Sequence, residues 1–109
     1  MNMECIRAAE ELLKAGVSAE VIDPITLAPL DINTIIKSVQ KTGKLLVADT
    51  AWVSCGVSAE IVARVAEYFG EKKKILVERI GFAPVPSPNT PALEKYFYPN
   101  SESIAVAAF

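Results

Sequence analysis

The side chains that could carry chemistry in this sequence are few, and their types exclude several kinds of active site. Histidine is absent, so no Ser–His or Cys–His pair can form a nucleophile and no imidazole can bind a metal. Cys5 and Cys55 lie far apart, and nothing else indicates secretion, so we expect two free, reduced thiols. Catalysis by this chain alone would need carboxylates, lysine, tyrosine or cysteine. We predict no catalytic, cofactor-binding or metal-binding residue.

Four residues are candidates for an interface with other protein surfaces: Asp49, Trp52, Glu60 and Tyr96. Asp49 follows an apolar run, at the place where ligand crevices open in α/β sheets. It could contact a basic partner or simply accept a hydrogen bond from its own loop, and we favour the second reading. Trp52 is the single tryptophan, a residue enriched in interface hot spots. Tyr96 belongs to an aromatic cluster that could pack under a proline-rich segment or face another subunit.

The tripeptide Gly56-Val57-Ser58 precedes a predicted helix and could bind an anion through free backbone amides. It matches neither a Walker motif nor a dinucleotide fingerprint, and we favour Ser58 as a plain N-cap of that helix. Glu60 then lies in the first turn, where a carboxylate complements the helix dipole without any catalytic role.

Periodicity and punctuation predict the elements that position these residues. Asp31 is an expected N-cap, and Gly43 and Gly70 are expected helix ends. We expect Asp49–Val57 to be a loop, and Gly81–Pro91 to be irregular because it contains four prolines. We expect helices at Met3–Ala15, Ile32–Thr42 and Ala59–Phe69, which alternate with strands at Ser18–Asp23, Lys44–Ala48 and Ile75–Ile80. A short helix should follow from Thr90-Pro91, and Ser103–Phe109 should be an apolar tail.

The predicted fold class is α/β, a three-layer sandwich in which a small, mostly parallel sheet is flanked by helices. The apolar run Lys44–Ala48 is typical of a strand buried on both faces, whereas Glu78 and Arg79 suit an edge strand. A chain that starts with a helix and holds three strands is short of a complete sheet. We therefore expect residues 1–109 to be a single domain that lacks its first strand and is a fragment of a longer chain.

Composition excludes some classes of partner. Eleven basic and 13 acidic residues give a net charge of −2 and no nucleic-acid footprint. No run of about 18 apolar residues indicates a transmembrane helix. The N-terminus lacks the basic and then apolar layout of a signal peptide, so we expect a cytoplasmic protein without a membrane partner.

Three segments in register carry a resemblance to a known family: Ala15–Asp49, Ala51–Glu67 and Glu78–Asn100. Together they resemble the C-terminal domain of the transketolase superfamily, and most of all the beta subunit of the thiamine-diphosphate-dependent 2-oxo acid dehydrogenases of the pyruvate, branched-chain or acetoin type. The chain departs from the family at Asp49-Thr50, where two acidic residues are usual, at the glycine-poor loop Trp52–Gly56, and at Pro24–Thr26, where an arginine is usual.

The resemblance implies a non-catalytic assembly and interface domain. In such enzymes, thiamine diphosphate and magnesium are held by other domains, which decarboxylate a 2-oxo acid and pass the acyl unit to a lipoyl arm. The implied partners are other domains or subunits of the parent enzyme, in a homodimer or an alpha/beta hetero-oligomer, and the lipoyl acyltransferase core.

Two other functions compete with this one. The first is a stand-alone regulatory module that binds an anion or nucleotide at the loop Trp52–Ser58. The second is a receiver domain with Asp49 as phosphoacceptor, which we disfavour because it needs an acidic pair after a first strand that is not present.

Overall fold

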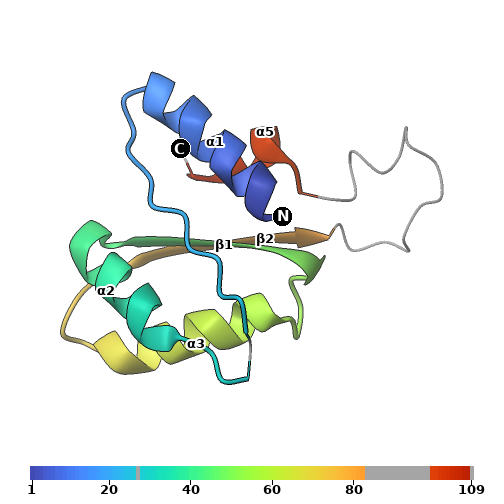
Figure 1. Ribbon diagram of the computed structural model, residues 1–109. Helices are drawn as coiled ribbons and strands as arrows, with labels where there is room; N and C mark the ends of the chain where they lie inside the picture. The colour runs from blue at the N-terminus through green and yellow to red at the C-terminus, as the bar shows by residue number, and fades with distance from the viewer. Residues whose placement is uncertain (27, 83–98, 109) are drawn as a thin grey trace.

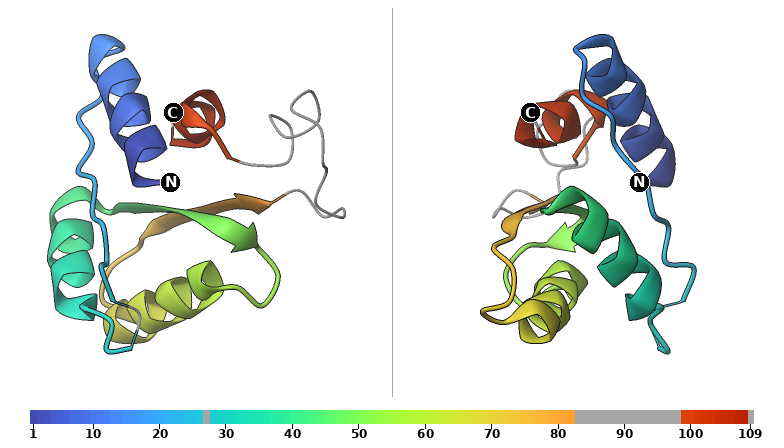
Figure 2. Two further views of the ribbon diagram at one scale, coloured as in Figure 1. Left: turned by 45° about the vertical axis from the view of Figure 1, so that its right-hand side comes forward. Right: turned by 90° about the vertical axis from the view of Figure 1, so that its left-hand side faces the viewer.

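Two parallel strands lie between two pairs of helices in the computed structural model, which describes residues 1–26, 28–82 and 99–108 (Figure 1). Helices α2 and α3 cover one face of the sheet, and α1 and α5 lie on the other, as the turned views also show (Figure 2). The predicted three-layer α/β arrangement is confirmed. The elements are α1 (Asn2–Lys14), α2 (Ile32–Thr42), β1 (Lys44–Trp52), α3 (Val57–Phe69), β2 (Leu76–Phe82) and α5 (Ser101–Ala108).

The sheet in the described part of the chain has two strands, and β1 pairs with β2 in parallel. Lys44 lies opposite Leu76, and the register runs without a shift to Ala48 opposite Ile80. Because parallel strands need a crossover, α3 carries the chain back from the end of β1 to the start of β2. Residues 45–49 and Ala51 of β1 are half-buried and Thr50 is exposed, so the prediction of a strand buried on both faces is wrong.

The predicted strand Ser18–Asp23 is also wrong, because this segment is an irregular connection between α1 and α2. This segment is attached to α2 through side-chain contacts of Glu20. The carboxylate of Glu20 accepts a hydrogen bond of 2.6 Å from the Ser38 hydroxyl and forms an ion pair with Lys41, both on α2. The hydrogen bonds from Lys41 and Ser38 hold the pKa of Glu20 below its usual value. Ile22 packs against the core beneath α2 and α3.

Helix α2 begins and ends where its sequence predicts. The Asp31 carboxylate accepts hydrogen bonds from the Thr34 hydroxyl at 2.6 Å and the Thr34 backbone N–H at 3.3 Å, and these lower the pKa of Asp31. Gly43 ends the helix with a φ of 73°, a left-handed conformation that glycine adopts without steric cost.

The main core lies between α2, α3 and the sheet. The buried side chains of both helices recur at helical spacing, and at the end of α3 Phe69 is buried whereas Tyr68 is exposed. Leu45 and Val47 of β1 pack against this cluster. Its fully buried members are Ile35, Ile36, Val39, Ile61, Val65 and Phe69.

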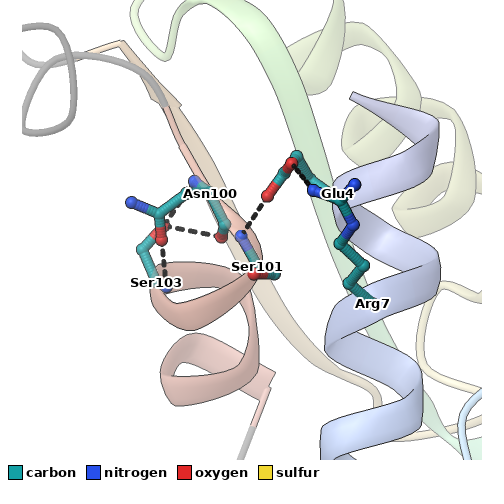
Figure 3. A network of polar contacts seen from close by, with 5 residues as sticks. All are labelled: Glu4, Arg7, Asn100, Ser101 and Ser103. Carbon is teal, nitrogen blue, oxygen red and sulfur yellow. Dashed lines mark hydrogen bonds and ion pairs between the residues drawn. The ribbon is translucent and has the colours of Figure 1, made fainter. Parts of the chain in front are cut away.

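Helices α1 and α5 form a second, smaller layer, joined by a carboxylate (Figure 3). Glu4 of α1 accepts a hydrogen bond of 2.7 Å from the backbone N–H of Ser101, the first residue of α5. Its other oxygen pairs with Arg7 at 3.0 Å. Asn100 and Ser103 cap the same helix end reciprocally, because the Ser103 N–H donates to the Asn100 side chain and the Asn100 N–H donates to the Ser103 hydroxyl, each at 2.9 Å.

The C-terminal helix starts two residues before the predicted apolar tail. Gly81 and Phe82, predicted to be irregular, belong to β2. The predicted short helix from Thr90-Pro91 lies outside the described residues. Within the described residues, the helices are too short or too polar to span a bilayer.

The core between α2 and α3 should dominate stability. Ile35 is 4% exposed, whereas Ile25 in the connection is 91% exposed. We expect Ile35→Ala to lower the free energy of unfolding by about 2–5 kcal/mol, because it leaves a cavity. The matched change Ile25→Ala should cost less than about 0.5 kcal/mol. Urea denaturation followed by circular dichroism measures both, and equal effects would contradict this placement of the core.

Candidate assembly surface

The carboxyl edge of the sheet holds two of the four predicted interface residues. Strand β1 continues to Trp52, so Asp49 and Trp52 lie in a strand and the prediction of a loop over Asp49–Val57 is wrong for its first half. The pairing resumes with Trp52 opposite Phe82, so residues 49–51 lie opposite Gly81 alone. This bulge lets β1 reach further than its partner and re-aims its last side chains.

Two glycines allow the backbone to approach itself at this bulge. A Cβ atom on Gly81 would lie less than 3.0 Å from the carbonyl oxygen of Ala51, and one on Gly56 would lie equally close to the carbonyl oxygen of Trp52. Real Cβ atoms essentially never come so near. The turn from β1 into α3 therefore depends on glycine at both positions.

Arg79 of β2 forms a hydrogen bond with the same turn. Its guanidinium donates a hydrogen bond of 2.7 Å to the carbonyl oxygen of Val53, and the pair is partly buried. Next to it, the rings of Trp52 and Phe82 meet edge to face with centroids 5.7 Å apart. Trp52 still has 47% of its surface exposed, so this edge presents a large aromatic side chain on a fixed backbone.

Helix α3 starts two residues earlier than predicted, at Val57 and not at Ala59. Its N-cap is Gly56, with an extended backbone and no side-chain cap, and Ser58 lies in the first turn, where its side chain is buried. The prediction that Ser58 caps this helix is wrong, because the tight approach of Gly56 to Trp52 places the helix start at Val57. Glu60 lies exposed in the first turn, as predicted.

The predicted site residues therefore lie on two neighbouring elements. Asp49 is half-buried in the bulge, Trp52 ends the strand, and Glu60 belongs to the helix that follows. Tyr96 lies outside the described residues. Cys5 and Cys55 are free thiols, and burial raises the pKa of Cys5. Among the residues that the structure describes, no group of three or more cysteines and carboxylates is placed to hold a metal ion.

A second exposed surface, on α1, was not predicted. The helical period places Ala8 and Leu12 on one side of α1, where they are buried, and Met3, Ile6 and Leu13 on the opposite side. Met3 is 61% exposed and Leu13 is 65% exposed. We call Met3, Ile6 and Leu13 the apolar α1 surface. Its signal in the sequence is the helical spacing of Met3, Ile6 and Leu13, which is interrupted by the exposed Glu10.

Comparison with known proteins identifies the domain. Residues 1–104 match the family described as the transketolase C-terminal domain. The chain belongs to this family. A solved structure described as a split gene transketolase, inactive beta4 tetramer, superposes with a TM-score of 0.74 and 28% identity over 97% of this chain and 33% of its own. The predicted family and fold are therefore confirmed.

Curated relatives include dehydrogenase beta subunits. The chain is 38% identical over 108 residues to the acetoin:2,6-dichlorophenolindophenol oxidoreductase subunit beta of Cupriavidus necator, covering 99% of this chain and 32% of that protein. It is 39% identical over 104 residues to the mitochondrial pyruvate dehydrogenase E1 component subunit beta of Dictyostelium discoideum, covering 95% of this chain and 29% of that protein. The chain thus spans about a third of the length of these relatives.

The Arg79–Val53 hydrogen bond can be tested with the single tryptophan as reporter. We expect Arg79→Met to lower the free energy of unfolding by about 1–2 kcal/mol, because a partly buried carbonyl loses a charged donor. Trp52 emission should also shift to the red as the turn loosens. Arg64→Met, at a half-buried position on α3, is the matched control and should leave the emission unchanged. Identical spectra for both variants would contradict the assigned role of Arg79.

Proposed function

We propose that this domain is a non-catalytic C-terminal assembly domain of a thiamine-diphosphate-dependent enzyme, namely the decarboxylating component, beta subunit, of a 2-oxo acid dehydrogenase or a transketolase-like relative. The relatives named above are subunits of oxidoreductases and dehydrogenases, and the similar structure is named as a tetramer. The apolar α1 surface is the observation that carries the proposal, because it leaves large aliphatic side chains in water.

Burial of the apolar α1 surface against another domain or subunit would stabilise the assembly. Fully burying one leucine or methionine side chain contributes about 1.5–3 kcal/mol. Obligate subunit interfaces are large and hydrophobic, and aliphatic stripes on helices are typical of them. On another side of α1, Glu11, Leu12, Ala15, Ala105 and Val106 line a depression between α1 and α5.

The edge residues supply a second contact in this proposal. Trp52, with Asp49 and Glu60 near it in sequence, would face another subunit or the lipoyl acyltransferase core at the carboxyl edge of the sheet. The partner protein would be an identical chain in a homodimer or the alpha subunit in a hetero-oligomer. Thiamine diphosphate and magnesium would be held by other domains of the parent enzyme, in the cytoplasm.

Disruption of the apolar α1 surface should weaken assembly. In the full-length subunit with its partner, we expect Leu13→Glu to raise the dissociation constant at least tenfold, because a charge replaces a leucine that the proposed interface would bury. Sedimentation velocity across a concentration series measures this change. Lys14→Gln, at the adjacent exposed position, is the control and should assemble normally. Normal assembly of both Leu13→Glu and Met3→Glu would overturn the assembly role of this surface.

The proposed division of labour predicts that this domain alone does not bind the cofactor. Isothermal titration of the 109-residue chain with thiamine diphosphate and magnesium chloride should give no saturable heat. The full-length subunit with its partner, titrated in the same buffer, is the positive control. Stoichiometric binding by the 109-residue chain would show that the cofactor site lies in this domain and would refute the proposal.

A further inference from the structure

We propose that the amino edge of the sheet, where both strands begin, is a docking surface for an extended acidic segment of a partner protein. Five lysines make up this surface, which we call the basic edge: Lys41, Lys44, Lys72, Lys73 and Lys74. The inference goes beyond the proposed function, because the basic edge lies at the opposite end of β1 from Trp52 and includes no residue of the apolar α1 surface.

The parallel pairing brings the basic edge together from two segments of the chain. Both strands point the same way, so the starts of β1 and β2 lie side by side (Figure 1). Lys44, the first residue of β1, lies opposite Leu76, the first residue of β2. The Leu76 N–H also donates a hydrogen bond of 3.1 Å to the carbonyl oxygen of Gly43. Lysines from the end of α2 and from the loop before β2 therefore meet at one edge.

The central lysine of the loop before β2 has a structural role. The Lys73 ammonium donates a hydrogen bond to the carbonyl oxygen of Gln40, in the last turn of α2. A cation at the carboxyl end of a helix also complements the helix dipole. Its neighbours Lys72 and Lys74 are exposed, and within the described part of the chain neither of them forms an ion pair. The contact of Lys73 therefore positions two ammonium groups that the fold itself does not use.

Positive charge is concentrated at this edge although the whole chain is slightly acidic. The net charge is −2, yet five of the eleven basic residues belong to the basic edge. Two carboxylates belong to the same region, namely Glu20, which pairs with Lys41, and the exposed Glu71 of the loop. The ammonium groups outnumber these carboxylates and repel one another, and a bound polyanion would relieve that repulsion.

Glu20 is an internal example of the ligand chemistry. It belongs to the irregular segment Ser18–Asp23, and its carboxylate accepts a hydrogen bond of 2.6 Å from the Ser38 hydroxyl and pairs with Lys41. An acidic side chain on an irregular stretch of chain is thus already bound at one end of the basic edge. The remaining lysines offer the same interaction to carboxylates from outside the chain.

An extended acidic segment of a protein fits this surface better than a nucleic acid does. In an extended chain, alternate side chains point to one face and lie about 7 Å apart, so alternate carboxylates can follow lysines on neighbouring segments. A nucleic acid carries a phosphate on every nucleotide and would extend past the basic edge, where the other carboxylates of this acidic chain would repel it. We therefore assign the surface to a segment in which acidic and uncharged side chains alternate.

The test measures the binding of a fluorescent peptide of alternating glutamate and serine to the 109-residue chain by anisotropy. We expect Lys72→Gln with Lys74→Gln to weaken binding at least fivefold, because two attractive charges are lost. Lys14→Glu, at an exposed position on α1, lowers the net charge by the same two units and should weaken binding less than twofold. The same peptide with glutamine in place of glutamate should not bind.

A second pair of variants tests the part of the surface that Glu20 occupies. We expect Glu20→Gln to tighten peptide binding about threefold, because Lys41 is then free to bind the peptide. Glu11→Gln removes an exposed ion pair with Lys14 on α1 and changes the net charge equally, so it is the matched control and should leave the affinity unchanged. Equal affinities of these two variants would contradict the proposal.

Three further results would overturn the proposal. The first is an unchanged affinity when Lys72 and Lys74 are replaced, and the second is an equal loss in the Lys14→Glu variant, which would show that only net charge matters. The third is tighter binding of a single-stranded oligonucleotide with as many charges as the peptide, which would assign the edge to a nucleic acid. The assembly test with Leu13→Glu concerns a different surface, so the two ideas fail separately.

Discussion

The parallel pairing of β1 with β2 is the constraint on which the described structure depends. Parallel strands cannot be joined by a tight hairpin, so the chain must cross over through α3, and both strands end at the same edge. At that edge β1 is longer than its partner, and the excess is absorbed in a bulge opposite Gly81. Backbone contacts at Gly81 and Gly56 and the hydrogen bond from Arg79 then leave the turn little freedom. Trp52 is the last residue of β1 before this turn.

The two helical layers are stabilised by different interactions. Helices α2 and α3 share a buried aliphatic core with β1, and hydrophobic burial is the dominant favourable term in folding. The layer of α1 and α5 has a smaller buried set and a carboxylate that joins the start of α5 to α1 through Ser101. The same layer exposes Met3 and Leu13. The core between α2, α3 and the sheet is therefore covered within the described residues, whereas part of the apolar surface of α1 is exposed to water.

Sequence reasoning predicted the features that are decided locally and missed those decided by distant neighbours. The limits of α2 follow from Asp31 and Gly43, and the buried faces of α2 and α3 follow from helical periodicity. Ser18–Asp23 was predicted to be a strand from composition, but a strand exists only where a partner offers hydrogen bonds. The bulge and the displaced start of α3 depend on Gly81 and Gly56 contacting β1 residues, and no pattern within one segment contains that information. The candidate surface was found in part: Trp52 was identified by its residue type, whereas the exposure of Met3, Ile6 and Leu13 depends on which side of α1 packs against its neighbours.

Family membership and the exposed side chains give different information about the function of this domain. The family was recognisable because three segments keep their order and spacing across nearly the whole chain, and that signal reports ancestry and fold. Activity does not follow from fold, because function lies in sites that are placed on it. Among the described residues, this domain exposes Met3, Ile6 and Leu13 on α1 and the aromatic side chain of Trp52 at the end of β1. Under the proposed function, covering these side chains with another subunit would gain free energy, which would link folding to assembly thermodynamically. Under the proposed function, the domain would stabilise the enzyme that contains it, and its own stability would be highest in the whole enzyme.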